Sequence, residues 1–118
     1  MSTTGTSALV AVMAALLFAS SRLPAEGGQT SVERGQKVFL DQKCSVCHAV
    51  AGKGNPKGAL DEIGSKQKAD EIREWIVNAP EMTKKTKAER KPVMRAYTSL
   101  SKEDVDGLVA YLSTLKKK

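Results

Sequence analysis

The chain has 118 residues, a formal net charge of +6, two cysteines and one histidine. This length predicts a single domain. The basic balance suits docking to acidic partners or anionic surfaces, and the lack of interleaved aromatic and basic residues argues against nucleic acid as a partner.

The N-terminal segment has the pattern of a targeting signal. Residues 8–19 are an unbroken apolar run, which fits the core of a signal peptide and is shorter than the roughly 20 residues of a membrane span. Residues 23–25 form a candidate cleavage site before Glu26. We therefore expect residues 1–25 to be a signal peptide and residues 26–118 to be the exported domain. An uncleaved anchor stays open as an alternative, because no Lys or Arg precedes the apolar run.

The first helix of the exported domain is predicted to begin at Thr30 and to run to about Lys43. Thr30 and Glu33 have the spacing of a capping box, in which each side chain bonds the backbone N–H of the other residue. Gly35 and Phe39 are four residues apart and therefore lie on one face of this helix.

Directly after this helix comes Cys44-Ser45-Val46-Cys47-His48, the C-x-x-C-H pattern through which a c-type haem is attached. Thiols three positions apart lie about one helical turn apart, which suits them to the two vinyl groups on one edge of a haem. The imidazole that follows at once can then bind the iron. The pattern predicts one covalent haem c per chain, with His48 as an iron ligand.

Three other interpretations of this pentapeptide are weaker. A thioredoxin-like dithiol expects a nearby βαβ pattern, and the sequence has no alternating strand segments. A structural zinc site needs four ligands, of which the cysteines and histidine supply three. A disulfide between Cys44 and Cys47 would close a small, strained loop.

The rest of the chain predicts two further helices separated by loops, so the fold class is all-α. Residues 51–65 are rich in Gly and Lys and predict a loop with one short turn at 59–63. Residues 69–78 predict an amphipathic helix that Pro80 ends. Residues 81–98 predict a basic loop. Ser101 is the expected N-cap of the final helix, whose apolar stripe is Val105, Leu108, Val109, Leu112 and Leu115.

The second axial ligand is open on this reasoning. The chain has no second histidine, so a methionine thioether is the strongest candidate. Met1 and Met13 belong to the expected signal peptide, which leaves Met82 and Met94. At least one of these two must instead fill core space, as methionine commonly does.

With these motifs, residues 30–116 resemble a class I monohaem c-type cytochrome of the bacterial, soluble kind. The first helix carries Gly35 and Phe39 into C-x-x-C-H, and the final helix carries Gly107 and Tyr111. The resemblance implies a small cytochrome c fold in which the N- and C-terminal helices cross and the haem lies in the centre.

The resemblance also implies roles for single residues. Residues 94–104 are similar to the methionine-ligand loop and helix start of that family, which assigns the sixth iron ligand to Met94, with Met82 as the alternative. Arg95 stands where a proline commonly follows the ligand. Pro56 is the candidate for the proline whose carbonyl accepts a bond from the proximal histidine.

Trp75 and Tyr97 resemble family residues that line the pocket or bond a haem propionate, with plain core packing as the alternative. The function implied is electron transfer between extracytoplasmic, for example periplasmic, redox partners that present acidic docking surfaces. The basic segment 84–95 would form the docking rim. We expect no enzyme activity, no nucleic-acid partner and no stable membrane span after leader cleavage. A haem c gas or ligand sensor with a weak or open sixth site is the alternative.

Overall fold

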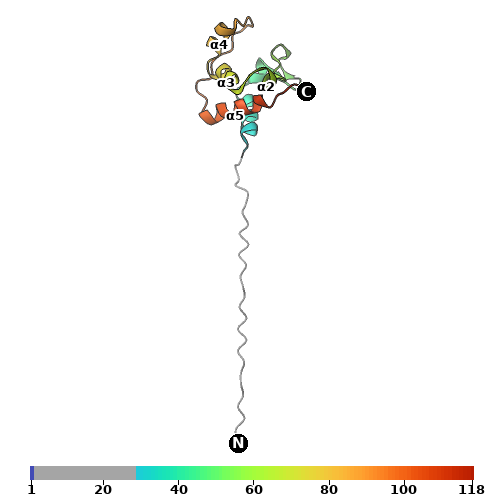
Figure 1. Ribbon diagram of the computed structural model, residues 1–118, viewed down its shortest axis with the longest axis vertical. Coiled ribbons are helices and arrows are strands. Elements are labelled where there is room, and N and C mark those ends of the chain that lie inside the picture. The colour runs from blue at the N-terminus through green and yellow to red at the C-terminus, as the bar shows by residue number, and fades with distance from the viewer. Residues whose placement is uncertain (2–28) are drawn as a thin grey trace.

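The computed structural model describes Met1 and residues 29–118, so the expected signal peptide lies almost wholly outside the described residues (Figure 1). In chain order the described part forms α1 (Ser31–Asp41), the 3-10 turn η1 (Cys44–Val46), β1 (Ala49–Val50), β2 (Lys53–Gly54), the 3-10 turn η2 (Pro56–Gly58), α2 (Ile63–Lys66), α3 (Ala69–Val77), α4 (Ala79–Thr86) and α5 (Lys102–Ser113). The predicted all-α class is confirmed, with one small sheet added. Within the described residues, no helix has the length and apolarity needed to cross a membrane.

The caps predicted for the first and last helices are present. Thr30 Oγ1 accepts the Glu33 N–H at 3.2 Å, and the Glu33 carboxylate accepts the Thr30 N–H at 3.1 Å. At α5, Ser101 Oγ accepts the Asp104 N–H at 3.1 Å. Each bond satisfies a backbone donor that the first turn of a helix leaves without a partner, so both helix starts are fixed locally.

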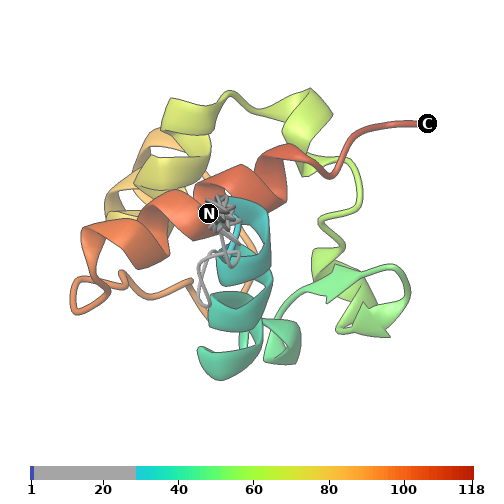
Figure 2. The same ribbon diagram turned by 90° about the horizontal axis from the view of Figure 1, so that it is seen from below.

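Helices α1 and α5 cross closely, as expected (Figure 2). Gly35 and Gly107 lie at the crossing, where a side chain on Gly35 would overlap the Gly107 carbonyl. One turn further along each helix, the rings of Phe39 and Tyr111 pack edge to face with their centroids 5.8 Å apart. Helix α3 packs on α5 through Ile72 and Ile76, which completes the buried core.

The segment after C-x-x-C-H is more ordered than the predicted loop. Strands β1 and β2 form a two-stranded antiparallel hairpin with Ala49 opposite Gly54 and Val50 opposite Lys53. The two turn residues, Ala51 and Gly52, both have positive φ, at 52° and 77°. A two-residue hairpin turn of this kind matches the natural twist of the strands. Strands of two residues are too short to produce the alternation by which a sequence predicts a strand.

The prediction of a loop from residue 81 is wrong, because residues 79–86 form α4. Pro80 sits in the first turn of α4, where its missing N–H costs no helical hydrogen bond. Asn78, with φ −142°, ends α3 and leads into the new helix. Helix α3 ends at Val77, within one residue of the predicted end, and Pro80 lies in the first turn of the helix that follows.

Candidate haem site

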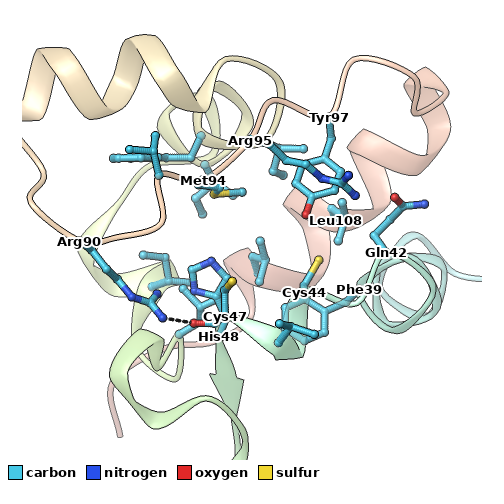
Figure 3. Close-up of a pocket in the computed structure, with 18 of the residues that line it drawn as sticks. Phe39, Gln42, Cys44, Cys47, His48, Arg90, Met94, Arg95, Tyr97 and Leu108 are labelled. Carbon is cyan, nitrogen blue, oxygen red and sulfur yellow. Dashed lines mark hydrogen bonds between the residues drawn. The ribbon is translucent and has the colours of Figure 1, made fainter.

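A cavity of about 620 Å³ lies between η1, the loop before α5, and the inner faces of α1, α3 and α5 (Figure 3). Apolar side chains form most of its wall. The charged residues among its lining are Lys43, Arg90 and Arg95, and no carboxylate is among them. Its size is within the usual range for small-molecule and cofactor sites, and its charge would complement an anionic group at the mouth.

The C-x-x-C-H segment forms one wall. Helix α1 ends before Lys43, which has left-handed backbone angles and turns the chain into η1. Within the turn, the Cys47 and His48 N–H groups donate to the Cys44 carbonyl at 3.1 and 2.9 Å. Both cysteines are free thiols and both line the cavity. Burial raises the pKa of the Cys44 thiol to about 11, so this sulfur stays protonated at neutral pH in the absence of a reaction partner.

The His48 ring is oriented by a hydrogen bond to the backbone. Its Nδ1 lies 3.0 Å from the Gly58 carbonyl oxygen, which can only accept, so Nδ1 carries the proton. Burial lowers the pKa of His48, which favours the neutral ring. A neutral imidazole protonated on Nδ1 has its lone pair on Nε2, the form that binds a metal.

The sequence predicted that the carbonyl of Pro56 accepts the hydrogen bond from His48. This prediction is wrong, because the acceptor is the carbonyl of Gly58. Pro56 is not among the residues that line the cavity. It opens the 3-10 turn η2, whose last residue is Gly58. The turn brings the carbonyl two residues downstream of the proline to the imidazole.

Asn55 fastens η2 to the cysteine turn. Its backbone N–H donates to the carbonyls of Ser45 and His48 at 3.1 and 3.2 Å, and its side chain accepts the Lys57 N–H at 3.0 Å. The preceding Gly54, with φ +110°, lies so close that a side chain there would overlap the His48 carbonyl. The hairpin and η2 are therefore joined to the backbone of the cysteine turn and of His48 by hydrogen bonds and close packing.

The loop before α5 forms the facing wall. Figure 3 shows Met94 reaching into the cavity from this loop, on the side opposite His48 and Cys47. Met82 is instead buried in α4 with 8% of its surface exposed, and it is absent from the cavity lining. Of the two candidate thioethers, the structure brings Met94 to the site and places Met82 in the packing of α4.

Trp75 and Tyr97 both line the cavity. The backbone N–H of Tyr97 donates to the Ile76 carbonyl at 2.9 Å, which ties the end of the loop to α3. The guanidinium of Arg95 lies 4.7 Å from the centre of the Tyr97 ring, within the range of a cation–π contact.

Sequence reasoning missed two residues at the site, Gly58 and Arg90. The Arg90 guanidinium donates a hydrogen bond to the Cys47 carbonyl, drawn as a dashed line in Figure 3. This bond joins residues that are 43 positions apart in the sequence, so no local sequence pattern predicts it. Among the described residues, no cluster of three or more His, Cys, Asp or Glu side chains is placed so that it could hold a metal ion.

Comparison with known proteins identifies the family. The family model Cytochrome c matches residues 32–116. The cytochrome c oxidase subunit 2 of Alkalihalophilus pseudofirmus is 33% identical over 99 residues, which amount to 77% of this chain and 28% of the relative. This chain thus corresponds to only a part of that larger protein. No solved structure matches the chain. The chain belongs to the cytochrome c family, whose members carry covalently attached haem c, and Cys44 and Cys47 fit the attachment motif of that family.

Proposed function

We propose that this protein is a single-haem electron carrier that moves electrons between extracytoplasmic redox partners. Membership of the cytochrome c family supports haem-based electron transfer. The observation that carries the finer proposal is the arrangement of the cavity, which has two thiols and an oriented imidazole on one wall and a thioether on the facing wall.

The residues present fit haem c by their own chemistry. Cys44 and Cys47 would hold the group through thioether bonds, and His48 and Met94 would bind its iron. The haem supplies the one-electron exchange between ferric and ferrous iron. The protein contributes a fixed His48 ring, a neutral sulfur ligand and an apolar wall, and the last two stabilise the ferrous state and raise the reduction potential.

The positively charged residues that line the cavity would also affect the haem electrostatically. Lys43, Arg90 and Arg95 place positive charge beside the site, and no carboxylate in the lining offsets it. Positive charge nearby complements anionic propionates and disfavours the extra positive charge of ferric iron. Tyr97, which stacks with Arg95, and Trp75 are candidates to bond a propionate or to pack on the ring.

The same proposal includes the compartment in which the protein works and the partners with which it exchanges electrons. We propose that residues 1–25 are a leader and that residues 26–118 work in the periplasm or another extracytoplasmic compartment. The similarity to part of a cytochrome c oxidase subunit supports both that compartment and an oxidase as one electron acceptor. The basic net charge, which is +6 for the whole chain and +5 without Arg22 of the leader, supports partners with acidic docking surfaces.

The test is the ferric and ferrous absorption spectrum of protein matured with haem c, measured beside Met94→Ala and Met82→Ala. We expect a six-coordinate low-spin haem whose ferric sulfur-to-iron charge-transfer band disappears in Met94→Ala and persists in Met82→Ala. The reverse pattern would transfer the ligand role to Met82. A high-spin parent that binds carbon monoxide at neutral pH would instead identify a ligand sensor, and a colourless protein would refute haem binding.

A further inference from the structure

The segment that carries Met94, residues 89–96, has few bonds to the rest of the molecule. At one end, the Ala88 N–H donates to a carbonyl in α4 at 3.0 Å, and at the other the Tyr97 N–H donates to the end of α3 at 2.9 Å. Within the part of the chain that the structure describes, the residues between these ends make a single hydrogen bond to any other segment, from the Arg90 guanidinium. Arg90 therefore supplies the one hydrogen bond between segment 89–96 and another segment of the described structure.

Arg90 binds at a junction behind the cysteine turn. Its guanidinium donates to the Cys47 carbonyl and lies against Gly58, where an added Cβ would overlap both groups. The carbonyl of the same Gly58 accepts the hydrogen bond from His48 Nδ1. One arginine thus joins the loop that carries Met94 to the backbone that orients His48 (Figure 3).

We propose that Arg90 is a positioning residue that latches segment 89–96 onto the C-x-x-C-H turn and so sets how often Met94 leaves the iron. The inference rests on the proposed His48/Met94 ligation. A cationic donor makes a stronger hydrogen bond than a neutral one, and here that bond offsets the entropy lost when an otherwise weakly held segment is ordered. When the hydrogen bond between Arg90 and Cys47 is broken and segment 89–96 moves away, the sixth coordination position of the iron is accessible to small ligands.

The chemistry of the latch favours arginine over lysine. The planar guanidinium presents several donors in a fixed fork, and one of its nitrogens donates to the Cys47 carbonyl while the group lies beside Gly58. A lysine at this position has one compact head on a flexible stem and would order the same bond at a larger entropic cost. Arg90→Lys should therefore restore part of the latch.

The test uses the ferric holoprotein and imidazole as the probe. A ligand that binds only the open form has an apparent affinity proportional to the open fraction. We expect Arg90→Ala to raise the apparent imidazole affinity by about tenfold, the effect of about 1.4 kcal/mol, and Arg90→Lys to raise it less. Lys91→Ala is the matched control, because it removes the same charge from the same segment and Lys91 makes no hydrogen bond or ion pair within residues 29–118. Its affinity should stay within about twofold of the parent.

The outcomes separate the latch from the function on which it rests. If the parent shows the sulfur-to-iron band and Arg90→Ala binds imidazole as Lys91→Ala does, the latch is refuted and the carrier stands. If the parent lacks the band, the Met94 ligation is refuted and the latch falls with it. A Tm lowered equally in both variants, with affinity changed only in Arg90→Ala, would distinguish positioning from general stability. If Arg90→Ala yields no holoprotein, Arg90→Gln and Arg90→Lys are compared with Lys91→Ala on the same criterion.

Discussion

Gly35 on α1 and Gly107 on α5 bring the two helix backbones into contact where the helices cross. A Cβ built on Gly107 would lie 3.0 Å from the Gly35 nitrogen, and one built on Gly35 would overlap the Gly107 carbonyl. The crossing seats Phe39 against Tyr111 and directs the end of α1 toward the cavity, where the cysteine turn begins. The position of the attachment turn therefore depends on two residues that lack side chains.

Gly35→Ala should destabilise the holoprotein. An alanine favours a helix by about 1 kcal/mol over glycine, but the overlap with Gly107 should outweigh this and lower the free energy of unfolding by about 1–3 kcal/mol. Gly107→Ala should cost less, because its nearest contacts lie at 3.0–3.3 Å. Denaturant unfolding would measure both, with Gln36→Ala on the exposed face of α1 as a control expected to stay within about 0.5 kcal/mol. Equal stability of Gly35→Ala and Gln36→Ala would contradict the close crossing.

The sequence predicted those parts of the fold whose signals are local. The capping pairs at Thr30 and Ser101 and the apolar periodicity of α3 and α5 each lie within one or two helical turns, and the structure confirms them. The sequence did not predict the start of α4, because a proline disrupts the interior of a helix but is well tolerated in the first turn of the next one. The hairpin was missed because its strands are two residues long.

The residues of the candidate site also fall into two groups, those that a local sequence pattern predicts and those that only the folded chain brings together. Cys44, Cys47 and His48 are adjacent in the sequence, so their spacing alone indicates the chemistry. Met94 lines the same cavity as His48, and Arg90 bonds Cys47, although each pair is more than 40 residues apart in the sequence, so these contacts form only in the folded chain. Gly58 was missed because its contribution is a backbone carbonyl, which any residue possesses.

Met82 should matter for stability and leave the iron unchanged. Its side chain is buried in α4, and truncation of a buried methionine to alanine costs about 2–5 kcal/mol. Met82→Ala should therefore lower the denaturation midpoint while it retains the ferric sulfur-to-iron band. Met94→Ala is the opposite control, since it should lose the band. Loss of the band in Met82→Ala would show that the assignment of the two methionines is reversed.

Gly58→Ala should change the reduction potential. Its Cβ would overlap the Cys47 carbonyl, which would displace the acceptor of the His48 bond. A weaker bond makes the imidazole a poorer donor to ferric iron, so the potential should rise, by roughly 20–60 mV for a change of up to tenfold in a one-electron equilibrium. Gly52→Ala is the matched control in the same loop, because no atom lies within 4 Å of its added Cβ, although its φ of +77° makes any side chain strained there. Protein-film voltammetry should show a shift in Gly58→Ala alone, and equal shifts would contradict the role of this carbonyl.

Electron transfer with an acidic partner should depend on charge at the cavity mouth. Lys91 lies between Arg90 and Pro92, which both line the cavity, whereas Lys68 precedes α3 and does not. Lys91→Glu should lower the second-order rate constant several-fold at low salt, with the difference shrinking as ionic strength rises and screens the charges. Lys68→Glu makes the same change in net charge away from this mouth and should have a smaller effect. Stopped-flow kinetics over a series of salt concentrations would measure the rate constant of electron transfer for both variants. Equal effects of the two substitutions would contradict the proposal that residues 84–95 form the docking rim.

The haem-free chain should lack a cooperative thermal transition. The cavity of about 620 Å³ is partly open and has a largely apolar wall, so without the haem these side chains would face water or unfilled space. This exposure of apolar surface is unfavourable, and a typical domain is stable by only about 5–15 kcal/mol, so we expect the walls to collapse or to lose their fixed packing. Calorimetry of protein produced without haem c maturation should show no heat-absorption peak, while far-UV circular dichroism retains part of its helical signal. A sharp calorimetric peak in the haem-free protein would show that the helix crossing alone sustains the fold and that the cofactor is not part of its core.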